Sequence, residues 1–335
     1  MQTRPLGRTG LQVPPLCLGT MTFGLQCDEP TSFAILDRAV EGGITFLDTA
    51  DVYPLGGSLD TVGRTEEIIG RWMRERRNRD GLLVATKCAG AMGPGPNDVG
   101  LSRHHIMRAV DASLRRLGTD VIDLYQVHAF DPRTPVEETL RALDDIVRTG
   151  KVRYVGCSNY PAWRLAEALR TSERLGIARY DTLQPRYNLL YRDIETELLP
   201  LARAEGLGVL VYNPLAGGFL SGKYRKGDEP PENTRFTLGT AGRRYQYRYW
   251  QDAQFDATAR LRETAEAKGH DLVSIAIAWV LAQPGITSAI VGASRPEQLA
   301  GVLAAPSLAL DDELREACEQ VWWSLPRRRV IEGYR

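Results

Sequence analysis

Short apolar runs alternate with longer amphipathic stretches along almost the whole chain. The short runs are rich in β-branched and aliphatic residues, whereas the stretches between them place apolar residues three or four positions apart. This alternation predicts parallel strands joined by crossover helices. Eight strands are expected, at residues 16–18, 45–47, 82–86, 121–127, 152–157, 182–183, 208–211 and 288–291.

The eight strand–helix units predict an α/β protein whose fold is a (β/α)8 TIM barrel. Residues 102–117 and 135–148 are clear examples of the helical pattern, and the second begins with a proline at an expected first-turn position. The chain has 335 residues and no sharp change of composition. Because such barrels exceed 250 residues as one domain, we expect a single domain over residues 1–335.

Two segments stand outside the repeating pattern. Residues 3–6 and 11–14 flank the turn sequence GRTG, which indicates an N-terminal β-hairpin placed to plug one end of the barrel. After the seventh strand, residues 222–250 are rich in Lys, Arg, Tyr, Pro and Gly. This length is unusual for a compact domain, so we expect a long functional or mobile loop there.

Composition narrows the classes of partner. Forty-two basic residues balance forty-two acidic ones, which removes the broad field expected for binding nucleic acid or anionic lipid. The segment RRYQYRYW at 243–250 mixes cations with aromatics, but in a neutral chain a loop near the substrate is favoured over a nucleic-acid surface. No apolar run approaches the ~18 residues of a membrane helix. A small-molecule substrate is therefore expected.

The cysteines and the N-terminal residues indicate in which cellular compartment the protein is expected. Five cysteines are scattered without the paired spacing of a disulfide framework or a zinc site, so we expect reduced thiols and no bound metal. The first ten residues, MQTRPLGRTG, are polar and turn-rich, unlike a secretory signal. A cytoplasmic protein is expected.

Titratable residues follow three successive expected strands. Asp48 ends the second strand with Tyr53 five residues later, Lys87 ends the third and His128 ends the fourth. In a barrel of this kind the chemistry gathers at the carboxyl ends of the strands. An ammonium beside a phenol lowers a pKa that is ordinarily about 10, so Lys87 would activate Tyr53 as an acid. Asp48 would hold Lys87, and His128 would orient a carbonyl or share in proton transfer.

These residues lie in motifs that resemble those of the aldo-keto reductase superfamily, in particular its larger bacterial-type members. The similar segments are GITFLDTADVY, LRRLGTDVIDLYQVH and GKVRYVGCSN, and the resemblance covers nearly the whole chain. It implies that Asp48, Tyr53, Lys87 and His128 form the catalytic tetrad of a reductase that uses NADPH/NADP+. Relatives that reduce carbon–carbon double bonds tend to replace the histidine, so reduction of an aldehyde or ketone is preferred.

The resemblance also implies a cofactor site. Ser158, Asn159 and Gln184 match residues that bind the nicotinamide carboxamide, and Tyr212 matches the aromatic residue that stacks on the nicotinamide ring. The segment YNPLAGGFLSGKY resembles the loop beside the pyrophosphate, through Leu215, Gly217, Leu220 and Gly222.

After the last strand, VGASRPEQL resembles the phosphate-binding segment that favours NADPH over NADH. The matching residues, at an expected helix start, are Gly292, Ser294, Arg295 and Gln298. Relatives commonly carry Asn, which contacts adenine, at the position of Val302. This chain therefore departs from the pattern at one adenine contact.

Two other functions stay open. The chain also resembles potassium-channel β-subunits, which are regulatory subunits that bind the cofactor on the same fold, and a tetrad does not distinguish them from enzymes. A dedicated sugar or nucleotide-sugar ketoreductase is a second alternative. No G-x-G-x-x-G fingerprint occurs, so a Rossmann fold is not supported.

Overall fold

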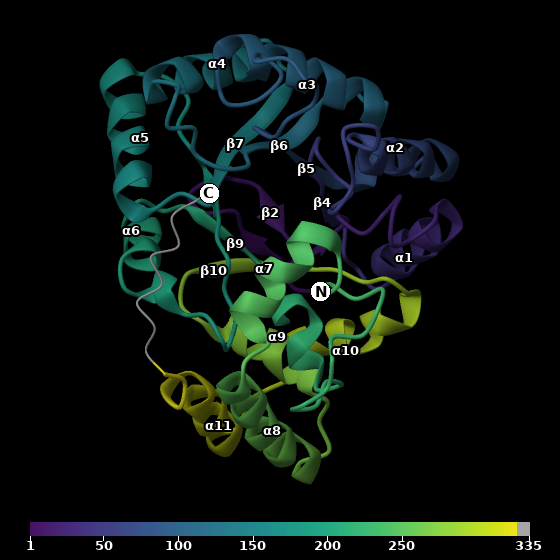
Figure 1. Ribbon diagram of the computed structural model, residues 1–335. Coiled ribbons are helices and arrows are strands. Elements are labelled where there is room, and N and C mark those ends of the chain that lie inside the picture. The colour runs from purple at the N-terminus through teal and green to yellow at the C-terminus, as the bar shows by residue number, and fades with distance from the viewer. Residues whose placement is uncertain (327–335) are drawn as a thin grey trace.

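The computed structural model describes residues 1–326, and within this range eight parallel strands close into a barrel (Figure 1). In barrel order they are β3 (Leu16–Gly19), β4 (Phe46–Asp48), β5 (Leu83–Cys88), β6 (Ile122–Val127), β7 (Val152–Ser158), β8 (Thr182–Gln184), β9 (Gly208–Tyr212) and β10 (Ile286–Val291), which pairs back onto β3. The predicted (β/α)8 fold is confirmed. Each strand begins within two residues of its predicted start.

Helices surround the barrel between the strands. They are α1 (Glu29–Glu41), α2 (Arg64–Arg76), α3 (Arg103–Leu117), α4 (Val136–Arg148), α5 (Ala162–Leu175), α6 (Leu198–Ala204), α7 (Gly239–Tyr249), α8 (Asp252–Ala267), α9 (Leu272–Ala282), α10 (Leu299–Ala304) and α11 (Asp312–Trp323). Among residues 1–326, none of these helices is long and apolar enough to cross a membrane.

Local signals set the ends of the predicted helices. The Ser102 hydroxyl accepts a hydrogen bond from the backbone amide of His105 at the start of α3, and Gly118 ends α3 with a positive φ of 63°. Pro135 is the N-cap of α4, one position before the first turn where it was expected. Its missing N–H costs nothing at either position.

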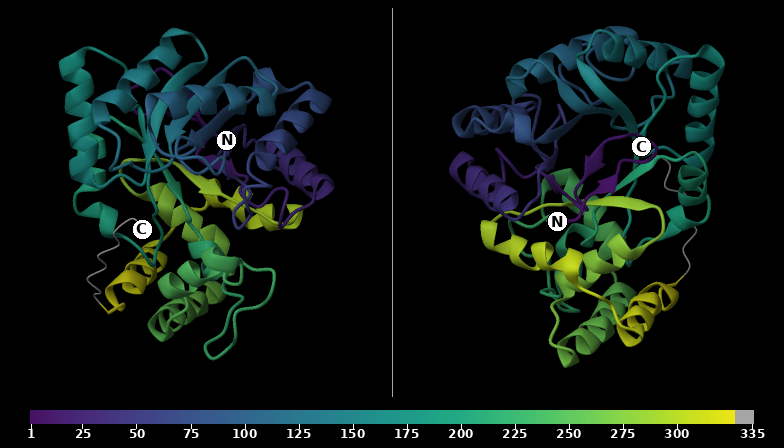
Figure 2. Two further views of the ribbon diagram at one scale, coloured as in Figure 1. Left: turned by 45° about the horizontal axis from the view of Figure 1, so that its top comes forward. Right: turned by 180° about the vertical axis from the view of Figure 1, so that it is seen from behind.

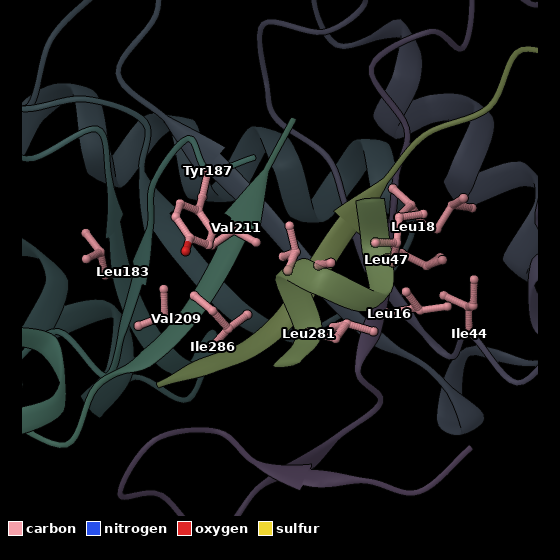
Figure 3. Packing of buried hydrophobic residues seen from close by; sticks show 14 of the residues in the cluster. Leu16, Leu18, Ile44, Leu47, Leu183, Tyr187, Val209, Val211, Leu281 and Ile286 are labelled. Carbon is pink, nitrogen blue, oxygen red and sulfur yellow. The ribbon is translucent and has the colours of Figure 1, made fainter. Parts of the chain in front are cut away.

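The barrel separates two apolar layers because successive strand side chains point to opposite faces. Side chains that point inward fill the barrel, namely Leu6, Val13, Cys17, Phe46, Ala85, Leu124, Leu210 and Ile290. Those that point outward, such as Leu16, Leu47 and Val209, pack in the layer between strands and helices (Figure 3). The inner layer stops short of the carboxyl ends of the strands, where polar residues replace it.

An N-terminal hairpin closes one end of the barrel, as predicted. Strands β1 (Arg4–Pro5) and β2 (Gln12–Val13) pair antiparallel, and the Arg8 amide donates to the Gly206 carbonyl just before β9. Gly7 has a φ of 59°, and a Cβ there would lie 2.4 Å from the Gly208 nitrogen, so only glycine is accommodated. The view from behind shows the hairpin nearest the reader (Figure 2, right). The opposite, carboxyl-terminal end is thus left for chemistry.

The segment 222–250 differs from the prediction, because its second half forms helix α7. Two glycines and several arginines conceal the helical pattern in the sequence. Tyr245 and Tyr249 are four residues apart and both are buried, which gives the helix an apolar face. In Figure 1, α7 lies in front of the barrel strands, whereas the hairpin lies behind them.

Candidate active site

The structure brings the four predicted tetrad residues together at the carboxyl end of the barrel. Asp48 follows inward-pointing Phe46 by two positions and Lys87 follows inward-pointing Ala85 by two, so both point into the barrel. His128 directly follows β6. The rings of Tyr53 and His128 meet edge to face, with centroids 5.8 Å apart.

Asp48 and Lys87 form a buried ion pair. The Lys87 Nζ lies 2.5 Å from Asp48 Oδ1 and 2.8 Å from the carbonyl oxygen of Thr49, and both side chains are buried. Burial lowers the pKa of Lys87, but attraction to Asp48 and to Tyr53 outweighs it and the pKa is raised overall. The ammonium therefore stays charged, 5.3 Å from the centre of the Tyr53 ring.

Two glutamines complete the contacts of the Asp48 carboxylate. Gln184 and Gln126 each donate from Nε2 to Asp48 Oδ2, over 2.8 Å and 3.2 Å, and Gln184 also donates to Gln126 Oε1. Sequence reasoning missed Gln126. The sequence feature that could have identified Gln126 is its two-residue spacing from the inward-pointing Leu124, which places both side chains on the same face of β6.

The pKa of Tyr53 departs from the sequence-based expectation. Burial raises it and outweighs the Lys87 ammonium, which acts in the expected, lowering direction. The expectation considered the neighbouring charge alone, and the loss of hydration around a fully enclosed phenol is the larger effect. Tyr53 is consequently protonated at neutral pH, which is the form that a proton donor requires.

His128 is neutral in this site. Burial, followed by repulsion from the Lys87 ammonium, lowers the pKa of His128 below its ordinary value of 6.5. Its backbone carbonyl accepts a 2.8 Å hydrogen bond from Asn159 Nδ2, which ties the loops after β6 and β7 together. A neutral imidazole N–H beside the Tyr53 phenol can donate a hydrogen bond to a carbonyl oxygen.

The residues expected around the nicotinamide also converge. Strand register places Ser158 beside Gln184, and the Ser158 hydroxyl donates to the Gln184 carbonyl over 2.8 Å. Tyr212 at the end of β9 donates from its hydroxyl to Asn159 Oδ1 over 2.8 Å. Through Gln184 and His128, this set is bonded directly to the tetrad.

The loop after β9 forms the short 3-10 helix η3 (Ala216–Ser221), which contains or adjoins Leu215, Gly217, Leu220 and Gly222. Gly217 has a φ of 71°, and its amide donates to Asn213 Oδ1. A Cβ at Gly217 would lie 2.6 Å from the Tyr245 ring of α7. The close approach that requires glycine at this position is therefore made by α7.

The predicted phosphate segment lies just after β10. The exposed Arg295 precedes the 3-10 helix η4 (Pro296–Gln298), and the Ser294 amide donates to Gln298 Oε1 over 2.8 Å. Val302, at the position of the usual adenine-contacting Asn, is 1% exposed and packs in the outer apolar layer. It offers no polar atom to a ligand.

Two cations that sequence reasoning missed lie in the same region. Arg235 packs beside Gly217, and its Nη1 is buried without a hydrogen-bond partner among residues 1–326. Lys223 has a pKa lowered by burial and by nearby Arg295. Nothing marks Arg235 among the many arginines of its segment. A buried guanidinium nitrogen without a partner suits an anion, so the residues present fit the phosphates of a dinucleotide.

Asp51 is a buried carboxyl outside the tetrad. Both of its side-chain oxygens lack a hydrogen-bond partner within the described residues 1–326. Burial, assisted by the negative Glu66, raises its pKa well above the ordinary value. Folding therefore favours the neutral form of the Asp51 carboxyl, compared with the unfolded chain, where the carboxyl ionises above about pH 4.

This difference predicts that Asp51→Asn stabilises the protein at neutral pH. The raised folded pKa costs stability as pH rises above the unfolded value, and a neutral amide removes that cost. We expect the melting temperature to rise by about 2–4 °C at pH ~7.5, and by less at pH ~4.5. Thermal unfolding at both pH values measures it, with the exposed Asp60→Asn as control. A gain that is equal at both pH values, or a loss, would contradict a raised pKa of Asp51 in the folded protein.

Comparison with known proteins agrees with this geometry. The model of the aldo/keto reductase family matches residues 15–322. An uncharacterised oxidoreductase, YrpG, of Bacillus subtilis (strain 168) is 40% identical, and the alignment covers 94% of each chain. A probable voltage-gated potassium channel subunit beta of Arabidopsis thaliana is 37% identical over 100% of both chains. The L-glyceraldehyde 3-phosphate reductase of Escherichia coli O157:H7 is 36% identical, over 89% of this chain and 86% of its own.

Proposed function

This chain belongs to the aldo/keto reductase family of oxidoreductases, and we propose that it uses NADPH to reduce an aldehyde or a ketone to an alcohol. One observation carries the proposal. A protonated Tyr53 lies above the buried Asp48–Lys87 ion pair, with the neutral His128 ring at its edge. Reduction of a carbonyl group needs a proton donor and a nearby positive charge, and this arrangement provides both.

When bound, a nicotinamide cofactor would supply the hydride that the carbonyl carbon needs, from its C4. Tyr53 gives its phenolic proton to the carbonyl oxygen, which becomes the alcohol hydroxyl. The Lys87 ammonium stabilises the phenolate that remains, and Asp48 keeps that ammonium in place. His128 donates its N–H to the carbonyl oxygen and so orients the carbonyl group for both transfers.

The cofactor would be held at three places. Ser158, Asn159 and Gln184 present amide and hydroxyl groups to the carboxamide, and Tyr212 presents its ring to the nicotinamide. Arg235 and Lys223 balance the pyrophosphate charge. Ser294 and Arg295, which lie at the turn after β10, would bind the 2′-phosphate that distinguishes NADPH from NADH.

Arg295→Ala is expected to narrow the preference for NADPH, while NADH binding hardly changes. A charge-assisted hydrogen bond contributes roughly 1.5–3 kcal/mol, or about ten- to a hundredfold in affinity. Because Arg295 is exposed, the lower part of that range is expected. Titration of both cofactors by quenching of protein fluorescence measures the change.

Arg235→Ala is the matched comparison, since it should weaken NADPH and NADH by the same factor. The two arginines are thereby distinguished by which cofactor each one affects. Equal losses for both cofactors in Arg295→Ala would show that Arg295 supports the common pyrophosphate or the fold. Because the buried Val302 offers no polar contact to adenine, we expect weaker binding of both cofactors without a change in which one is preferred.

A substrate panel followed by NADPH absorbance tests the proposed activity. It should include simple aldehydes and ketones, a sugar aldehyde and a triose phosphate, since one relative is an L-glyceraldehyde 3-phosphate reductase. The likeness to a potassium channel subunit over the whole chain supports a cofactor-binding regulatory subunit as the second candidate. Binding of NADPH without turnover of any carbonyl compound would favour that candidate.

A further inference from the structure

A cavity of about 480 Å³ lies between α4 and α5, outside the barrel. Two of its aromatic residues belong to the loops of the candidate active site. Phe130 is two residues beyond His128, and Tyr160 directly follows Asn159. Thr171 of α5 and Thr139 of α4 also line the cavity.

A stack of aromatic rings and one guanidinium adjoins this cavity; Phe130, Tyr160 and Arg164 line it, whereas Tyr180 and Trp163 lie outside its lining. Tyr180 contacts Tyr160 edge to face with centroids 5.6 Å apart, and Tyr160 contacts Phe130 at 6.2 Å. The Arg164 guanidinium lies 4.9 Å from the centre of the Phe130 ring and 4.1 Å from that of Trp163. The stack thus runs from buried Tyr180 to Trp163, whose side chain is 61% exposed.

The charges that line the cavity form three ion pairs, and the Arg164 Nε is left buried without a hydrogen-bond partner among residues 1–326. The three pairs are Arg133 with Asp131 at 3.2 Å, Arg164 with Glu167 at 2.6 Å, and Arg174 with Glu137 at 3.4 Å. A charged ligand would lose hydration without meeting an opposite unpaired charge. An uncharged ring would gain by contact with Phe130, Tyr160 and the flat guanidinium of Arg164.

We propose that this cavity is a second ligand site, separate from the catalytic one, which takes a flat, uncharged aromatic molecule and regulates reduction. Its volume lies in the range of about 300–1,000 Å³ that is typical of small-molecule pockets. A ligand that displaces Phe130 shifts the loop carrying His128. The Asn159 amide holds the backbone of the same loop. The regulatory half of the proposal rests on the proposed reductase activity, whereas the binding half does not.

Indole is the probe, and the test uses the protein saturated with NADP+ so that the cofactor site is occupied. Saturation-transfer NMR should show saturable binding with a dissociation constant of about 1 mM or tighter. Thr171→Trp fills the cavity from α5 and should weaken binding by at least about tenfold. The exposed Thr196→Trp makes the same change elsewhere and should leave binding unaltered. No saturable binding, or equal binding to both variants, would overturn the site.

Arg164→Ala is a second test of the site, which still applies if Thr171→Trp fails to fold. It removes one wall of the cavity and should weaken indole binding about three- to tenfold, whereas Arg170→Ala on the same helix, 67% exposed, should not. For regulation, indole should change kcat at saturating substrate by at least about twofold in the wild type and not in Thr171→Trp. If indole binds but does not change kcat, the ligand site is supported and the proposed regulation is wrong. The binding result does not depend on whether the reductase is active.

Discussion

Tyr53→Phe is expected to lower the rate of carbonyl reduction by about 10²–10⁴-fold, the usual contribution of a general acid. The substitution removes only the hydroxyl, so the ring should keep its contact with His128 and its place over Lys87. The Tyr53 hydroxyl is not among the proposed contacts to the cofactor phosphates. NADPH affinity is therefore expected to stay within about threefold of the wild type.

Steady-state reduction of the best aldehyde or ketone from the substrate panel measures the loss. Tyr245→Phe removes a hydroxyl from a second tyrosine in the same region and should have little effect on kcat. A rate for Tyr53→Phe within about a factor of three of the wild type would rule out Tyr53 as the acid.

Lys87→Met is expected to be the most damaging substitution for both rate and stability. Removing one partner of a buried ion pair typically costs about 3–5 kcal/mol, because the other charge is left uncompensated. The ammonium lowers the pKa of the Tyr53 phenol, so its loss should raise the apparent pKa that governs reduction. A pH–rate profile measures the second effect and denaturant unfolding the first.

The pH dependence gives a further check on this pair. The pKa of Lys87 is raised on folding, so the stabilisation is complete below the ordinary lysine value of about 10.4 and is lost as pH rises through the folded value. Lys87 itself therefore adds no pH dependence between about pH 6 and pH 9, so a stability difference between wild type and Lys87→Met that shrinks as pH falls would report protonation of the uncompensated Asp48 in the variant. Adding Asp48→Asn should recover part of the stability. A near-normal rate with an unshifted profile would make Lys87 structural.

Periodicity was sufficient to predict the barrel. Most strand residues are apolar and buried, and such short apolar runs can be recognised in a single sequence because they do not depend on distant contacts. Helix α7 was missed because its apolar face is set by packing against the Gly217 loop, which no local pattern records.

The residues of the candidate site likewise fall into those that the sequence predicts and those that only the folded structure reveals. Strand ends revealed Asp48, Lys87 and His128, since topology brings the carboxyl ends of parallel strands together. Arg235 was missed because its isolation is a property of burial within the folded protein. The net direction of the Tyr53 pKa was wrong for the same reason, since hydration is lost only when the barrel forms.

The pairing of β10 with β3, which closes the barrel, affects how the protein folds during its synthesis. The Thr22 hydroxyl donates to the carbonyl of Ala293, which is 271 residues later in the chain. During translation the whole tetrad leaves the ribosome well before the residues that complete this pairing. Until then β3 and β9 present open sheet edges, which are prone to pair with other chains. The candidate site should consequently be complete only once β10 has been synthesised, and chaperones that cover such edges should raise the yield of folded protein.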